Sequence, residues 1–103
     1  MYGTIMRARV KPGHREIFES MMKEQTGGDR QPTGFHSFDV AWEDRDPDRL
    51  VLVVRFADKE SYVANAESPE QDAEYRQMLD HLEGEPEWID VHWEAHVGED
   101  VTA

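Results

Sequence analysis

Three segments of the chain alternate apolar and polar residues and a fourth is a short run of consecutive apolar residues, and both patterns predict β-strands. The predicted strands are residues 4–10, 35–42, 50–56 and 87–97. Helical spacing occupies about 14–25, and a broken helix begins after Asp58, restarts after Ser68 and ends near Gly84. Strand, helix, strand, strand, helix, strand is the ferredoxin-like β-α-β-β-α-β order. The sequence therefore predicts an α+β domain with a four-stranded antiparallel sheet.

The second half of the broken helix carries a strong start signal. Ser68 occupies the cap position, Pro69 the first helical position, and Gln71 lies three residues after the cap. This arrangement predicts a capping box, in which the two side chains satisfy each other's backbone N–H groups. Gly84 is the residue predicted to end this helix.

The third strand is apolar on both faces, because five consecutive apolar residues run from Leu50 to Val54. A strand with one wet face would alternate instead. Two helices can cover one face of such a sheet, so we expect a second copy of the chain to cover the other. We also expect this dimer face to carry charge-paired rows, formed by Arg7, Arg9, Arg55, Asp39, Asp90 and Glu94.

Length and charge narrow the function. The 103 residues suggest one domain over 1–97 and a loose tail over 98–103. The net charge is −12, and residues 56–103 hold the whole excess, with fourteen acidic and two basic residues. Such a field repels phosphate backbones and anionic lipid, so we expect neither a nucleic-acid nor a membrane partner. The absence of cysteine excludes disulfides and thiolate sites, and with no signal-peptide pattern it suggests a cytoplasmic protein.

Two patterns suggest a metal site at first sight. The acidic turn that starts at Asp44 opens like a calcium loop, but Arg49 and Arg55 occupy the positions that need glycine and glutamate. His92, Glu94 and His96 share one face of the last strand and could bind a transition metal. We favour charge pairing for that face, and we predict no metal.

Soft and aromatic side chains are concentrated on the helix-facing side of the sheet. They can fill a core, or they can surround a cavity for a flat hydrophobic ligand with Tyr62, Asn65, Tyr75 and His36 as polar groups. The predicted substrate-binding set is Met6, Phe18, Met22, His36, Phe38, Trp42, Phe56, Tyr75 and Met78, and the predicted catalytic pair is Tyr62 and Asn65.

The chain resembles the antibiotic-biosynthesis monooxygenase superfamily of dimeric α/β barrels over nearly its whole length. The resemblance rests on MYGTIMRARVKPG, PTGFHSFDV, LVLVVRFADKESYVANAESP and the aromatic last strand. It implies a pocket between sheet and helices and packing of two subunits through their sheets. The family contains cofactor-independent monooxygenases that act on polyketide aromatics and quinols, and also haem-degrading enzymes.

The haem degraders of this family use an asparagine, a tryptophan and a haem-ligating histidine. The resemblance aligns these positions with Met6, Asn65 and about Glu74, which all differ in type.

The aromatic-polyketide oxygenases use an asparagine and a tryptophan on the third strand, where this chain has Leu52 and Phe56. Their histidine on the second strand falls at Trp42, and their tyrosine on the following helix is retained as Tyr62.

Three interpretations remain open from the sequence. The first is a small monooxygenase without cofactor that oxidises a phenol, anthrone or quinol. The second is a non-catalytic protein that binds a hydrophobic ligand, and the third is a structural domain with a filled core. In the first, the protein must bind the phenol, help to remove its proton and exclude water.

Overall fold

The computed structural model describes residues 1–27 and 32–95, and only the backbone is described for 25–27. The elements are β1 (Tyr2–Val10), α1 (Arg15–Gly27), β2 (Phe35–Trp42), β3 (Arg49–Phe56), α2 (Lys59–Ala66), α3 (Pro69–Leu79) and β4 (Leu82–His92). All strand pairs are antiparallel, and the sheet order is β2-β3-β1-β4. The predicted ferredoxin-like α+β fold is thus confirmed. Residues predicted as the end of the last strand and the tail (96–103) lie outside the described residues.

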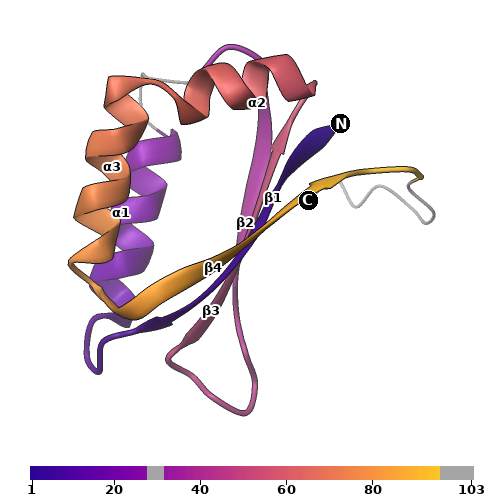
Figure 1. Ribbon diagram of the computed structural model, residues 1–103. Coiled ribbons are helices and arrows are strands. Elements are labelled where there is room, and N and C mark those ends of the chain that lie inside the picture. The colour runs from indigo at the N-terminus through magenta and orange to yellow at the C-terminus, as the bar shows by residue number, and fades with distance from the viewer. Residues whose placement is uncertain (28–31, 96–103) are drawn as a thin grey trace.

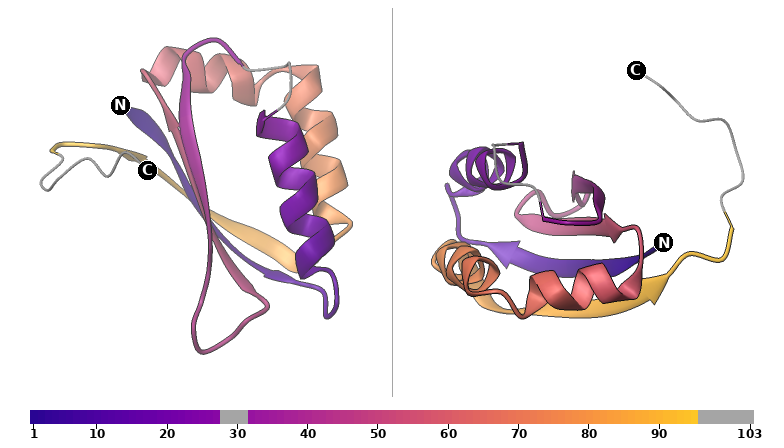
Figure 2. Two further views of the ribbon diagram at one scale, coloured as in Figure 1. Left: turned by 180° about the vertical axis from the view of Figure 1, so that it is seen from behind. Right: turned by 90° about the horizontal axis from the view of Figure 1, so that it is seen from above.

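The three helices lie on one side of the sheet (Figures 1 and 2). Phe18 of α1 packs against the helix-facing side chains of β1 and β3, and all of them are buried because this is where two apolar faces meet. The largest fully buried side chains are Phe18, Phe56, Met6, Leu50 and Val10. None of the described helices is long and apolar enough to span a bilayer.

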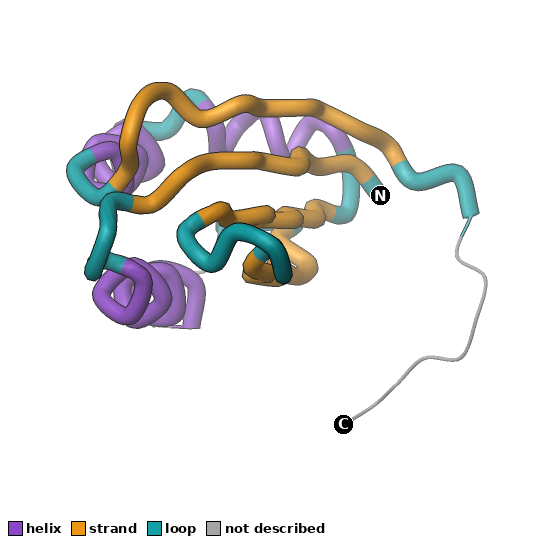
Figure 3. The backbone as a smooth tube through the Cα atoms, turned by 90° about the horizontal axis from the view of Figure 1, so that it is seen from below, coloured by secondary structure: helices purple, strands orange, loops and turns teal. Residues whose placement is uncertain are grey.

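The last strand begins at Leu82, five residues before the predicted start. Lys11 N donates to the His81 carbonyl oxygen at 2.9 Å, and Leu82 pairs with Val10, so β4 joins β1 directly after α3 (Figure 3). Between Arg7 and Arg9 the register shifts, because residues 84–86 of β4 lie opposite Ala8 alone. The acidic segment 83–87 belongs to this bulged stretch and does not alternate, which is why periodicity did not reveal it.

Gly84 lies inside this bulge and does not end the preceding helix, which corrects the prediction. Its φ is +72°, a conformation that glycine adopts at little cost. α3 ends at Leu79, where the cap residue Asp80 donates its backbone N–H to the Met78 carbonyl oxygen.

The register of β2 also corrects one face assignment. The pairing shifts between Phe35 and Ser37, so Phe35 pairs with Phe56 and their rings lie 5.8 Å apart at 81°. His36 is left exposed, and its Nδ1 lies 2.8 Å from the Ser37 hydroxyl oxygen. Phe35 therefore shares the helix-facing side with Phe38, although strict alternation had put them on opposite faces.

Both predicted helix caps are present. The Asp58 carboxylate accepts the Ser61 N–H at 2.8 Å, and the Ser68 hydroxyl oxygen accepts the Gln71 N–H at 3.1 Å. The second half of the capping box is absent, since the Gln71 side chain accepts from Asn65 Nδ2 at 3.2 Å instead. This bond ties α2 to α3 beside the cavity described below.

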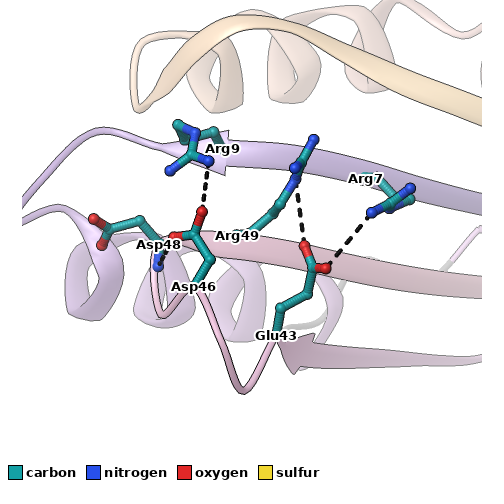
Figure 4. Close-up of polar contacts among 6 residues, drawn as sticks. All are labelled: Arg7, Arg9, Glu43, Asp46, Asp48 and Arg49. Atoms are coloured by element: carbon teal, nitrogen blue, oxygen red, sulfur yellow. Dashed lines mark hydrogen bonds and ion pairs between the residues drawn. The ribbon is translucent and has the colours of Figure 1, made fainter.

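The sheet face without helices carries ion pairs between β1, β3 and the β2–β3 turn (Figure 4). Glu43 lies 3.5 Å from Arg7 and 3.3 Å from Arg49. Arg9 binds Asp46, and the Arg9 guanidinium lowers the pKa of that carboxyl group by hydrogen bonding and charge.

Of the carboxylates predicted for these rows, only Asp39 pairs with an arginine, with Arg55 at 2.7 Å. Asp90 pairs in register with Thr4 and lies on the opposite, helix-covered side. Glu94 follows β4 and lies 3.6 Å from His92. The prediction failed because strand pairing puts Ile89 opposite Ile5, on the face of the arginines, and Asp90 opposite Thr4, on the helix-covered face.

Candidate active site

A cavity of about 470 Å³ lies between the helix-facing side of the sheet and helices α2 and α3. Its lining is mostly apolar, and every helix and strand contributes to it. Seven of the predicted site residues line it, namely Tyr62, Asn65, Met22, Phe38, Phe56, Tyr75 and Met78. The sequence reasoning did not select the remaining lining residues, which are Thr4, Leu52, Val54, Ala66, Gln71, Asp72, Glu74, Trp88 and Asp90.

Four residues of the predicted substrate-binding set do not line the cavity. Met6 and Phe18 are completely buried in the core. Trp42 packs edge-on against Phe18 with ring centroids 6.4 Å apart, and its indole N–H donates to the Glu19 carboxylate. His36 is exposed on the edge strand β2. Periodicity places Met6, Phe18 and Trp42 on the correct layer, but it does not distinguish a filled position from a cavity wall, and the register shift in β2 removes His36 from this layer.

Tyr62 is held at the cavity by a hydrogen bond and by aromatic contacts. Its hydroxyl donates to Asp90 Oδ1 at 2.8 Å. The ring lies 5.2 Å from that of Tyr2 and 5.8 Å from that of Phe56, measured between centroids. Contacts from β1, β3 and β4 therefore orient the Tyr62 hydroxyl toward β4.

The environment of Tyr62 keeps its hydroxyl protonated. Burial, followed by the hydrogen bond to Asp90, raises the pKa of Tyr62 to about 12. At neutral pH this side chain is a hydrogen-bond donor and does not serve as a proton acceptor. Asp90 is the acceptor in this pair, and it also belongs to the cavity wall.

The sequence contained one signal for Asp90 that only the strand pairing reveals. Asp90 lies opposite Thr4 in the β1–β4 register, and Thr4 is on the buried face of β1. Threonine at this apolar face is satisfied locally, since its hydroxyl donates to the Ile89 carbonyl oxygen at 3.1 Å. A polar residue among the apolar residues of a strand face indicates a polar neighbour on the adjacent strand. The strand register is needed to identify that neighbour.

A second aromatic wall is formed by Tyr75 of α3 and Trp88 of β4. Their ring centroids lie 5.8 Å apart at an interplanar angle of 57°. Trp88 remains 41% exposed although it lines the cavity, so this wall stands at the open side. Flat side chains here can stack on an aromatic ligand that enters from solvent.

The described residues provide few suitable ligands for a metal ion or a haem group. Among residues 1–27 and 32–95, no three histidine, cysteine or acidic side chains are arranged to hold a metal ion. His92 and Glu94 are close together, while His96 lies outside the described part of the chain. The described lining contains no imidazole, and the haem-ligating position of the related enzymes is occupied at about Glu74 by an anion. These residues do not fit haem.

A sequence profile of the antibiotic biosynthesis monooxygenase family matches residues 1–77, from β1 through most of α3. The chain belongs to this family. The match confirms the resemblance found in the sequence. A comparison with curated proteins found no match.

Solved structures of this family share the fold. A protein from Nitrosomonas europaea assigned to the antibiotic biosynthesis monooxygenases superposes with a TM-score of 0.76 at 21% identity, covering 92% of this chain and 100% of that one. A variant of SnoaB, a cofactor-independent oxygenase from Streptomyces nogalater, gives 0.80 at 14% identity and 95% and 97% coverage. A family protein from Deinococcus radiodurans gives 0.75 at 10% identity with full coverage of both chains. At these identities the likeness establishes the fold alone.

Proposed function

We propose that this family member is a small monooxygenase that oxidises a hydrophobic phenol, anthrone or quinol without a cofactor. The observation that carries the proposal is the cavity of about 470 Å³, whose wall is largely apolar with a few converging polar groups. This size lies within the range of small-molecule sites. A structural domain with a filled core would not contain such a space.

The chemistry requires a substrate that reduces oxygen by itself. When an anthrone is oxidised to a quinone, its CH₂ group becomes C=O and its two hydrogens leave with the second oxygen atom as water, so the substrate supplies all four electrons that O₂ accepts. The protein then has to bind the substrate, assist loss of its proton and keep water out. The Tyr62 hydroxyl donates to Asp90 and holds that carboxylate at the cavity wall as the candidate proton acceptor, and Asn65 is positioned by its bond to Gln71.

Oxygen uptake with a panel of anthrones and quinols, without added flavin or metal, tests this function. We expect Tyr62→Phe to lower turnover roughly 10²-fold, the size of an acid–base contribution, because it removes the hydroxyl that holds Asp90, the candidate proton acceptor. Asn65→Ala should reduce turnover as well. Tyr2→Phe is the matched control, since Tyr2 contacts the Tyr62 ring but does not line the cavity. Unchanged turnover in both site variants would remove these residues from the mechanism.

A second function is binding of a hydrophobic ligand without turnover. It is favoured by one observation: of the positions compared with the polyketide oxygenases, only Tyr62 retains the residue type. Ligand binding with no oxygen uptake from any substrate in the panel would decide for this second function.

We also propose that two copies of the chain pack through the sheet face without helices. This face exposes apolar side chains, including Ile89 at 46%, next to the Arg55–Asp39 pair. The Arg55 guanidinium also lies 5.2 Å from the centre of the Trp93 ring. Light scattering at micromolar concentration is the test. Val53→Asp in the middle of β3 should yield monomer, whereas Val63→Asp on α2 should leave a dimer, and a wild-type monomer would refute the proposal.

A further inference from the structure

The cavity wall has an aromatic part and a polar part, and both contain a residue of β4. Trp88 and Asp90 line the cavity, and one residue of the strand separates them. Side chains two positions apart on a strand point to the same face and lie roughly 6.5–7 Å apart along it. Their partners on β1 keep the same order, since Trp88 pairs with Met6 and Asp90 with Thr4. The strand therefore sets the distance between a flat surface and a hydrogen-bond acceptor.

The aromatic part consists of Trp88 and Tyr75 of α3. Their ring centroids lie 5.8 Å apart, and this contact holds the indole at the cavity wall. Trp88 is nevertheless 41% exposed, so part of its ring is available to a ligand. A flat ring that covers this part removes apolar surface from water and adds an aromatic contact.

The polar part is the hydrogen-bonded pair of Tyr62 and Asp90. The Tyr62 hydroxyl donates to Asp90 Oδ1 at 2.8 Å. Because a carboxylate accepts several hydrogen bonds through its two oxygens, this bond leaves Asp90 able to accept from a ligand hydroxyl as well. Thr4 does not compete for the carboxylate, since its own hydroxyl donates to the Ile89 carbonyl oxygen at 3.1 Å.

From this arrangement we infer that the cavity binds a fused-ring phenol lengthwise, with its hydroxyl at Asp90 and its far ring against Trp88. The inference rests on the proposal that this cavity binds a phenol, and it adds the shape of the ligand and the residue that selects it. In a phenol with a single ring, that ring lies next to the hydroxyl and does not extend along β4 to Trp88. In a fused system with the hydroxyl at its end, the second ring extends in that direction. A hydroxyl on the long side of the same system would allow one of the two contacts at a time.

Two isomers of one phenol measure this selection. 2-Naphthol and 1-naphthol have the same formula and the same two rings, and they differ in whether the hydroxyl stands at the end or on the long side. By isothermal titration calorimetry at neutral pH, we expect wild type to bind 2-naphthol roughly threefold to tenfold more tightly, the size of one aromatic contact. 2-Methoxynaphthalene has no hydroxyl proton and should bind about tenfold or more weakly than 2-naphthol, because a hydrogen bond to a carboxylate is among the stronger ones.

Substitutions of two tryptophans locate the effect. Trp88→Leu should weaken binding of 2-naphthol roughly threefold to tenfold and that of 1-naphthol by less than about twofold, so that the preference disappears. Trp88→Phe keeps a flat ring and should retain most of the preference. Trp93→Leu is the matched control, because Trp93 follows β4, contacts the Arg55 guanidinium and does not line the cavity. Circular dichroism of each variant verifies that the fold is retained.

The outcomes separate this inference from the proposed function. Equal affinity of wild type for the two isomers, equal affinity for 2-naphthol and its methoxy derivative, or the same response to Trp93→Leu as to Trp88→Leu overturns the inference. Each of these results leaves the oxygen-uptake proposal standing. A preference for 2-naphthol that depends on Trp88, without oxygen uptake from any substrate of the panel, supports the inference and refutes the oxidation. If neither naphthol binds, the cavity is not a site for phenols and both proposals fail.

Discussion

The ionisation of Tyr62 is the property of the site that can be measured most directly. Burial and the hydrogen bond to Asp90 raise its pKa from 10.0 to about 12. Asp90→Asn replaces the charged acceptor by a neutral amide of similar size and leaves the burial in place. Since burial is the larger cause, we expect the pKa of Tyr62 to fall from about 12 in this variant and still to remain above 10.0.

Near-ultraviolet absorbance of tyrosinate, followed from about pH 9 to about pH 13, measures this ionisation. The chain contains three tyrosines, so subtraction of the Tyr62→Phe titration isolates the signal of Tyr62. A step near pH 10 in the difference curve would refute the half-buried position of Tyr62 and its bond to Asp90. An unchanged step in Asp90→Asn would show that Asp90 is not the partner.

The raised pKa of Tyr62 also determines how the stability of the fold changes with pH. Between pH 10 and about pH 12 the unfolded chain loses the Tyr62 proton while the folded chain keeps it. The folded state then binds more protons, so the free energy of unfolding falls as the pH rises through this window. Because Tyr62 is only about half buried, solvent screening limits the effect to roughly 1 kcal/mol. Urea unfolding of wild type and Tyr62→Phe should diverge accordingly, with the steeper decline in wild type.

Three further substitutions test the fold by urea unfolding. Gly3→Ala would place its Cβ 1.8 Å from the Val54 carbonyl oxygen, a backbone atom. We therefore expect the free energy of unfolding to fall by about 3 kcal/mol or more, and a fall below about 1 kcal/mol would contradict this packing. Phe18→Ala empties a fully buried position and should lower the free energy of unfolding by about 3–5 kcal/mol. Ile17→Ala, at a 55% exposed position of the same helix, should lower it by less than about 1 kcal/mol. Equal losses would mean that α1 turns a different face toward the sheet. Ser68→Ala removes the oxygen that caps α3 and should cost about 1 kcal/mol, while a neutral result would show that the cap does not contribute.

Local physics explains why much of the fold could be predicted. The order of strands and helices follows from periodicity, because residues on a strand alternate faces and those on a helix return every three to four positions. The cap of α3 could be predicted because Ser68 and Pro69 are preferred there for reasons of local geometry and hydrogen bonding. The uncovered apolar face of β3 is likewise a property of consecutive residues.

The sequence by itself also determined the layer of the site, since Tyr62, Asn65 and Tyr75 lie on helix faces that turn toward the sheet. Only the tertiary structure decided which positions of this layer border the cavity and which are filled. Met6 and Phe18 have the same character as Met22 and Phe38, yet the first two fill the core and the others border the cavity. The difference depends on how far apart the helices and the sheet lie, which no local pattern encodes.

Asp90 illustrates the same limit for chemistry. Its face follows from the β1–β4 register, in which Asp90 pairs with Thr4 on the helix-covered side of the sheet. Alternation groups Asp90 with His92 and Glu94 but does not say which side of the sheet this group faces, and a pairing shifted by one position would place Asp90 among the arginines. The order of helices and strands follows from local preferences along the chain. The hydrogen bond between Tyr62 and Asp90 depends instead on strand pairing between residues far apart in sequence.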